Sequence, residues 1–109
     1  DVLVEFSDCL RRGVRGIDLV ARYGGEEFVL VMPETDRDFA VSVAERLRGD
    51  VEKLPFATRR GAAISVTTSI GLAEWRGPSD TTEALLGRAD RALYSAKRAG
   101  RNRVVASAA

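Results

Sequence analysis

Apolar residues recur every four positions along residues 39–51, and this spacing constrains the fold more strongly than any other feature of the chain. The residues at this spacing are Phe39, Val43, Leu47 and Val51, with Ala40 and Ala44 beside them. An α-helix completes a turn in about 3.6 residues, so these side chains share one face. We therefore predict a helix with this face buried, opened by Thr35 and Asp38 in the arrangement of a capping box.

A second helix is predicted from Asp80, with Glu83 three residues later, to Gly100. Its interior face is expected to carry Leu85, Leu86, Ala89, Leu93 and Ala96. Residues 1–12 show apolar residues at three-to-four spacing, which indicates the end of a further helix that buries Cys9 as a small apolar group.

Segments rich in β-forming residues lie between these helices. Residues 17–23 and 28–32 flank Gly24-Gly25 and predict a hairpin. Residues 53–63 predict a short strand and turn, residues 64–74 a longer strand, and residues 104–105 an edge strand. This order predicts an α+β fold with helices packed on a largely antiparallel sheet.

The composition excludes several classes of protein. The chain has 109 residues, which suits one small domain, and its apolar runs are too short to span a membrane. It has no histidine and one cysteine, so an internal disulfide and zinc sites built from Cys and His are excluded. A net charge of +1 gives no reason to expect binding to a nucleic-acid polymer. We expect a cytoplasmic protein.

Any chemistry must therefore use carboxylates, basic side chains or a metal ion held by oxygen. Gly24 and Gly25 stand at the predicted hairpin tip beside the carboxylates of Glu26 and Glu27. Glycines allow a tight turn and let a ligand approach the backbone, and two carboxylates suit a divalent ion held against a triphosphate. From these residues alone, an ordinary hairpin with solvated acids remains open.

Four stretches in order resemble the GGDEF family of diguanylate cyclase domains, in particular its response-regulator cyclases. Residues 24–28 match the signature pentapeptide in its GGEEF form, residues 66–73 resemble the strand that follows, residues 89–97 resemble the final helix, and residues 100–102 complete the match. The resemblance implies a ferredoxin-like, nucleotide-cyclase-like fold and the condensation of two GTP molecules into cyclic di-GMP and pyrophosphate. It also implies a homodimer in which each subunit brings one GTP.

The resemblance assigns roles to individual residues. It implies that Gly24 and Gly25 pass close to GTP and that Glu26 and Glu27 bind Mg²⁺ or Mn²⁺, Glu26 being indispensable for catalysis. It places Lys97 and Arg101 on the triphosphate; these residues would share one helix face if the helix continued through Gly100. The alternative for both is a solvated helix end that compensates the helix dipole.

The resemblance also implies a product-inhibition site. Arg15 and Asp18 form an R-x-x-D motif with five residues between Asp18 and Gly24, and Arg46 matches a further arginine of such sites. Arginine can bind a phosphate or a guanine edge through two parallel hydrogen bonds. The alternative is a surface ion pair, which contributes about 0–1 kcal/mol.

The chain departs from the family pattern at its start. The first strand and helix, with another metal-binding aspartate, are missing, so we expect residues 1–109 to be the C-terminal two-thirds of a domain and to be inactive alone. Two other functions stay open. A receptor of the same family would bind cyclic di-GMP without making it, and a ferredoxin-like interaction or RNA-binding module would show salt-sensitive RNA affinity.

Overall fold

The computed structural model describes residues 8–9, 12, 19–22, 28–32, 35–53, 55–57, 63–65 and 67–107. Its elements in chain order are β1 (Leu19–Arg22), β2 (Phe28–Val31), α2 (Arg37–Lys53), β3 (Pro55–Ala57), β4 (Ala63–Ser65), β5 (Ile70–Leu72), α3 (Thr82–Arg98) and β6 (Val104–Ala106). This α+β arrangement confirms the predicted fold class.

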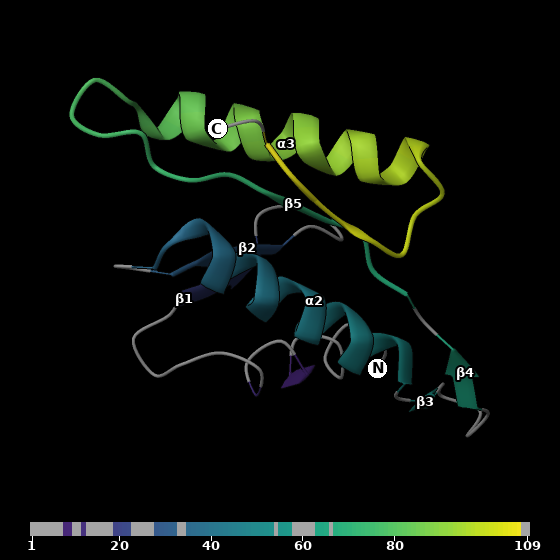
Figure 1. Ribbon diagram of the computed structural model, residues 1–109. Helices are drawn as coiled ribbons and strands as arrows, with labels where there is room; N and C mark the ends of the chain where they lie inside the picture. The colour runs from purple at the N-terminus through teal and green to yellow at the C-terminus, as the bar shows by residue number, and fades with distance from the viewer. Residues whose placement is uncertain are drawn as a thin grey trace.

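The strands form three pairs (Figure 1). β1 and β2 are antiparallel, with Leu19 opposite Val31 and Arg22 opposite Phe28, as the hairpin prediction required. β3 and β4 are also antiparallel, whereas β5 and β6 run parallel, with Gly71 opposite Val105. The parallel pair is possible because the whole of α3 connects its two strands.

The single strand predicted over residues 64–74 is wrong, because two separate strands lie in this stretch. β4 ends at Ser65 and β5 begins at Ile70, and residues 67–69 are not in a strand. The two pieces pair with different partners, β3 and β6. The division therefore follows from long-range pairing, which the local run of β-forming residues does not encode.

The β5–β6 pair lies between the two helices, with α3 on one side and α2 on the other (Figure 1). Successive residues of a strand point to opposite faces. Ile70 and Leu72 accordingly pack with Ala40 and Ala44 of α2. Gly71 faces α3, where an added Cβ would lie 2.3 Å from the Ala89 carbonyl oxygen. The glycine thus allows the strand to lie directly on the helix backbone.

Helix α2 buries the face that its sequence predicted, with one exception. Ala40, Val43, Ala44, Leu47 and Val51 are buried, and they form the helix's contribution to the core. The prediction that Phe39 belongs to this buried face is wrong, because Phe39 is 48% exposed. The cap is also shifted by one residue: the Asp36 Oδ1 accepts a hydrogen bond of 2.8 Å from the Phe39 N–H, which puts Asp36 at the capping position.

Helix α3 begins two residues later than the predicted start at Asp80. Thr81 caps it, because the Thr81 Oγ1 accepts a hydrogen bond of 3.0 Å from the Ala84 N–H. Ala92 and Ala96 are buried, while the predicted leucines at 85, 86 and 93 are half-buried. The interior face of α3 also contains Arg88, which is 8% exposed. The sequence pattern did not predict that this residue is buried.

Three further observations complete the fold. Cys9 is a free, buried thiol at 4% exposure, as predicted. Trp75 is 52% exposed and belongs to the rim of the molecule. Among the described residues, no helix is long and apolar enough to cross a membrane.

Candidate phosphate-binding site at the end of helix α3

Three of the nine predicted site residues lie in the described part of the chain: Lys97 and Arg101 at the end of α3, and Arg46 on α2. The other six are Arg15, Asp18, Gly24, Gly25, Glu26 and Glu27, which lie outside the described residues. Their roles, and their positions relative to Lys97 and Arg101, therefore stay predictions. The structure describes the two strands that flank the glycine-glutamate loop, which end at Arg22 and begin again at Phe28.

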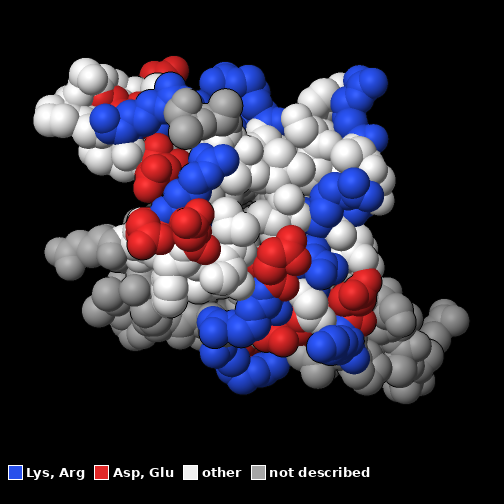
Figure 2. Space-filling model, in the orientation of Figure 1, with Lys and Arg blue, Asp and Glu red and all other residues white. Residues whose placement is uncertain are grey.

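Basic side chains gather at the C-terminal end of α3 and in the turn that follows. Lys97, Arg98, Arg101 and Arg103 are all exposed within seven residues of chain. Figure 2 shows basic groups at the side of the molecule where α3 ends, and a mixture of acidic and basic groups over α2. We call these four residues the α3-end cluster. A group of exposed cations of this kind can bind a polyanion such as a triphosphate.

Two members of the α3-end cluster are already engaged. The Arg98 guanidinium lies 5.7 Å from the centroid of the Tyr94 ring and donates a 3.3 Å hydrogen bond to the tyrosine hydroxyl. Arg103 Nε donates a 3.1 Å hydrogen bond to the backbone carbonyl of Arg101. Within the described residues, by contrast, the side chains of Lys97 and Arg101 make no hydrogen bond or ion pair. In the part of the chain that the structure describes, they are thus the two cations of the cluster that can bind a ligand without losing a partner.

The chain leaves α3 through a left-handed turn at Gly100, where the sequence predicted the helix to end, so the helix does not continue through this residue. α3 ends at Arg98, and the Arg101 N–H donates a 3.0 Å hydrogen bond to the Ala96 carbonyl. This is the closing bond of a Schellman motif, with Gly100 at the position where positive φ is needed. Gly100, Arg101 and Asn102 have φ values of 125°, 64° and 48°. Lys97 and Arg101 therefore come from different local structures and not from one helix face.

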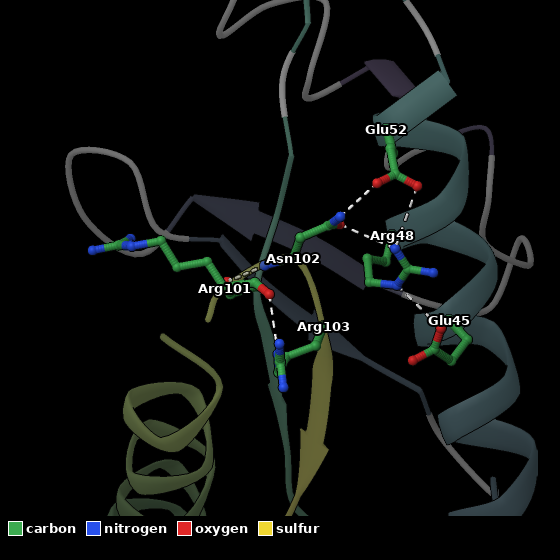
Figure 3. Close-up of polar contacts among 7 residues, drawn as sticks. Glu45, Arg48, Glu52, Arg101, Asn102 and Arg103 are labelled. Atoms are coloured by element: carbon green, nitrogen blue, oxygen red, sulfur yellow. Dashed lines mark hydrogen bonds and ion pairs between the residues drawn. The ribbon is translucent and has the colours of Figure 1, made fainter. Parts of the chain in front are cut away.

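Positive φ at two successive non-glycine residues costs about 1–2 kcal/mol at each. The surrounding contacts must therefore hold the turn in place. Asn102 supplies most of them (Figure 3): its backbone N–H donates to Ser69 Oγ at 3.1 Å, its Nδ2 donates to Glu52 Oε2 at 2.5 Å, and its Oδ1 accepts from Arg48 Nη1 at 3.0 Å. Sequence reasoning missed this network. Asparagine after a helix-ending glycine is a signal that could have indicated it, because asparagine tolerates positive φ.

Arg46 lies on the exposed side of α2, opposite the buried face formed by Val43, Leu47 and Val51. This position agrees with the expected outer side of the helix. The binding role proposed for Arg46 involves Arg15 and Asp18, so the product-inhibition site stays a prediction.

No group of three or more potential metal ligands occurs among the described residues. The two carboxylates predicted to bind metal, Glu26 and Glu27, are hard oxygen donors, which fit Mg²⁺ or Mn²⁺ and not a soft metal. Two carboxylates also suit Mg²⁺ in particular, because this ion usually keeps waters and substrate phosphates among its ligands. The donor chemistry of the sequence thus fits the expected ion.

A shallow concavity of about 320 Å³ lies between α3 and β6, lined in part by Arg76, Arg88 and Ser107. None of the predicted site residues lines it. Arg88 is held there by Asp80 through hydrogen bonds of 3.0 and 2.5 Å and by the Glu74 carbonyl at 2.9 Å. We therefore interpret this region as a structural ion pair beside a surface depression.

Comparison with known proteins agrees with this fold and these motifs. The family model described as "Diguanylate cyclase, GGDEF domain" matches residues 1–103. The chain therefore belongs to the GGDEF domain family, which confirms the family inferred from the sequence motifs.

Named relatives and solved structures extend the match. The chain is 50% identical over 110 residues to the response regulator PleD of Caulobacter vibrioides, covering all of this chain and 24% of PleD. It matches the structure of diguanylate cyclase SiaD from Pseudomonas aeruginosa, in complex with its activator SiaC, with a TM-score of 0.90 and 40% sequence identity. This match covers 97% of this chain and 40% of the SiaD chain. It also matches the structure of the coiled coil and GGDEF domain of DgcB from Caulobacter crescentus, in complex with c-di-GMP. The TM-score of this match is 0.89 and the sequence identity is 31%, and the match covers 97% of this chain and 56% of the DgcB chain.

Proposed function

We propose that the chain is the catalytic part of a diguanylate cyclase that condenses two molecules of GTP into cyclic di-GMP. The match to the GGDEF family over residues 1–103 supports this proposal. The observation that carries the substrate assignment is a pair of exposed cations, Lys97 and Arg101, whose side chains have no partner among the described residues. Because the chain spans 24% of the length of PleD, the activity is proposed for the full-length protein that contains these residues.

In this proposal Lys97 and Arg101 bind the triphosphate of GTP. The lysine supplies a compact charge, and the arginine can donate two parallel hydrogen bonds to phosphate oxygens. Gly24 and Gly25 allow the nucleotide to approach the backbone of the loop after β1. These contacts would hold the α-phosphorus of one GTP in line with the 3′-hydroxyl of the second, so that binding energy contributes to orientation.

Glu26 and Glu27 would hold the divalent ion. When bound, Mg²⁺ or Mn²⁺ supplies charge stabilisation to the phosphate oxygens during phosphoryl transfer. Two phosphodiester bonds form in the overall reaction and two pyrophosphates leave. Each subunit brings one GTP, and in each half-reaction a 3′-hydroxyl from one nucleotide attacks the α-phosphorus of the other and displaces pyrophosphate, so the proposal includes a homodimer.

Arg15, Asp18 and Arg46 would form a separate site for the product. Arg46 fits such a role because it lies on the exposed side of α2. The proposal thus assigns Lys97 and Arg101 to the substrate and Arg46 to feedback inhibition by the product.

The decisive experiment replaces Glu26 by alanine in the full-length protein and measures both cyclic di-GMP synthesis and cyclic di-GMP binding. We expect synthesis to fall at least about 100-fold, with binding retained. Glu83→Gln, which changes an exposed acid in the first turn of α3, is the matched control and should keep the wild-type rate.

Undiminished synthesis in Glu26→Ala would contradict the proposed catalytic role. A wild-type protein that binds cyclic di-GMP but makes none, with Mg²⁺ and GTP supplied, would instead identify a receptor of the same family.

A further inference from the structure

Arg101 has its side chain directed away from α2, whereas the side chain of the next residue, Asn102, points towards that helix (Figure 3). Both residues have positive φ, so neither is held by a regular helix or strand. The direction of the Arg101 side chain therefore depends on whatever fixes the turn.

Every hydrogen-bonding group of the Asn102 side chain that has a partner in the described residues is directed to α2. Its Oδ1 accepts from Arg48 and its Nδ2 donates to Glu52, while its backbone N–H is bound to Ser69 just before β5. Asparagine combines a donor and an acceptor on one short side chain and tolerates the left-handed conformation. Few other residues could meet these three demands together.

The groups that hold Asn102 stand on a rigid base. Arg48 and Glu52 lie four residues apart on α2 and also pair with one another at 3.6 Å. The neighbouring Leu47 and Val51 are 2% and 0% exposed, so the helix is anchored in the core at this point. Glu45 holds Arg48 from the other side through a 3.1 Å bond to Nε.

We propose that Asn102 is a positioning residue for GTP binding: it locks the left-handed turn to α2 so that the Arg101 guanidinium is held ready for the triphosphate. This inference rests on the proposed function, which assigns Arg101 to the triphosphate. Asn102 itself touches no substrate in this arrangement. Its effect on the reaction passes through the conformation of its neighbour.

A structural role alone would make a different prediction. If Asn102 only attached β6 to the rest of the fold, its removal would lower stability and would act independently of Arg101. A positioning role requires that the two residues act as a unit on GTP affinity, so that their effects are not additive.

The test is a double-mutant cycle in the full-length protein, with Arg101→Ala, Asn102→Ala and the double variant. The measurements are KM for GTP, from pyrophosphate release, and the melting temperature of each variant. We expect Arg101→Ala to raise KM about 10-fold, Asn102→Ala about 5-fold, and Asn102→Ala to add less than about 2-fold once Arg101 is absent. Asp50→Asn, which changes an exposed acid of α2 outside this hydrogen-bond network, should leave KM within about 2-fold of wild type.

The outcomes separate the inference from the function on which it rests. If Arg101→Ala leaves KM unchanged, the proposed triphosphate role of Arg101 fails. If Arg101→Ala raises KM but Asn102→Ala does not, or if the two increases multiply, the positioning role fails while the assignment of Arg101 stands.

A charge swap keeps the inference testable if Asn102→Ala does not fold. Asn102→Asp sets a carboxylate against Glu52, which should raise KM, and a second change, Glu52→Gln, restores a donor opposite the new acceptor. We expect Asn102→Asp with Glu52→Gln to recover most of the wild-type KM. No recovery in a pair of variants with wild-type melting temperatures would overturn the proposal.

Discussion

Asp80 and Arg88 form a bidentate ion pair in which the side chain of Asp80 is 3% exposed and that of Arg88 is 9% exposed. Asp80 also accepts hydrogen bonds of 3.0 Å from the backbone N–H groups of Arg76 and Thr81. One carboxylate therefore organises the loop that leads into α3. The hydrogen bonds from Arg88 hold the pKa of Asp80 well below its ordinary value of 3.8.

This lowered pKa predicts how the ion pair contributes to stability as pH changes. Since the folded state favours the ionised carboxylate, the contribution is complete above the ordinary pKa and is lost as pH falls below it. We expect Asp80→Asn to lower the melting temperature at pH 7 by on the order of 10 °C. Thermal unfolding should show the difference in melting temperature between wild type and variant becoming smaller as pH falls from 5 to 3. A difference that stays constant over this range would contradict the claim that the ionised form of Asp80 stabilises the fold.

We expect substitution of Gly71 to cause a severe packing defect between β5 and α3. The added Cβ would lie 2.3 Å from both the Ala89 carbonyl oxygen and the Leu93 backbone nitrogen, which a helix cannot easily move. We expect Gly71→Ala to reduce the free energy of unfolding by about 2 kcal/mol or more. Gly87→Ala is the matched control: the nearest atom is 3.6 Å away, so this variant should gain about 0.5–1 kcal/mol. Urea unfolding of both variants measures the difference, and equal effects would show that the close approach of β5 to α3 is wrong.

Lys97 and Arg98 offer a sharp comparison within one helix turn. Lys97 has no internal partner among the described residues, whereas Arg98 is engaged with Tyr94. We expect Lys97→Ala to raise KM for GTP about 10-fold and Arg98→Ala to change it less than about 2-fold. Steady-state kinetics on the full-length protein gives both values. A larger effect from Arg98 would assign the triphosphate to the other side of the α3-end cluster.

We expect Arg46→Ala to weaken feedback inhibition by cyclic di-GMP. If Arg46 binds the product from the exposed side of α2, its removal should raise the cyclic di-GMP concentration that halves the initial rate by about 10-fold. The measurement is the initial rate at increasing product concentration, normalised to the rate without added product. Arg91→Ala, an exposed arginine on α3, serves as the control and should keep the wild-type inhibition curve. Identical curves for both variants would remove Arg46 from the product site.

The elements of this fold could be predicted wherever a local period encoded them. The four-residue repeat from Val43 to Val51 predicted the buried face of α2, and β-forming segments around Gly24 and Gly25 predicted the β1–β2 pairing. The family and the identity of the exposed cations Lys97 and Arg101 also followed from the sequence. These features depend on residues close together in the chain, where spacing alone determines which side chains share a face.

Tertiary contacts decided the rest. The split of residues 63–72 into β4 and β5, the burial of Arg88 against Asp80 and the attachment of Asn102 to α2 all join segments that local periodicity cannot relate. The left-handed turn that carries Arg101 belongs to the same class. Its two non-glycine residues with positive φ cost free energy locally and persist because Ser69, Arg48 and Glu52 hold the turn. The energy of those contacts exists only once the distant segments have come together.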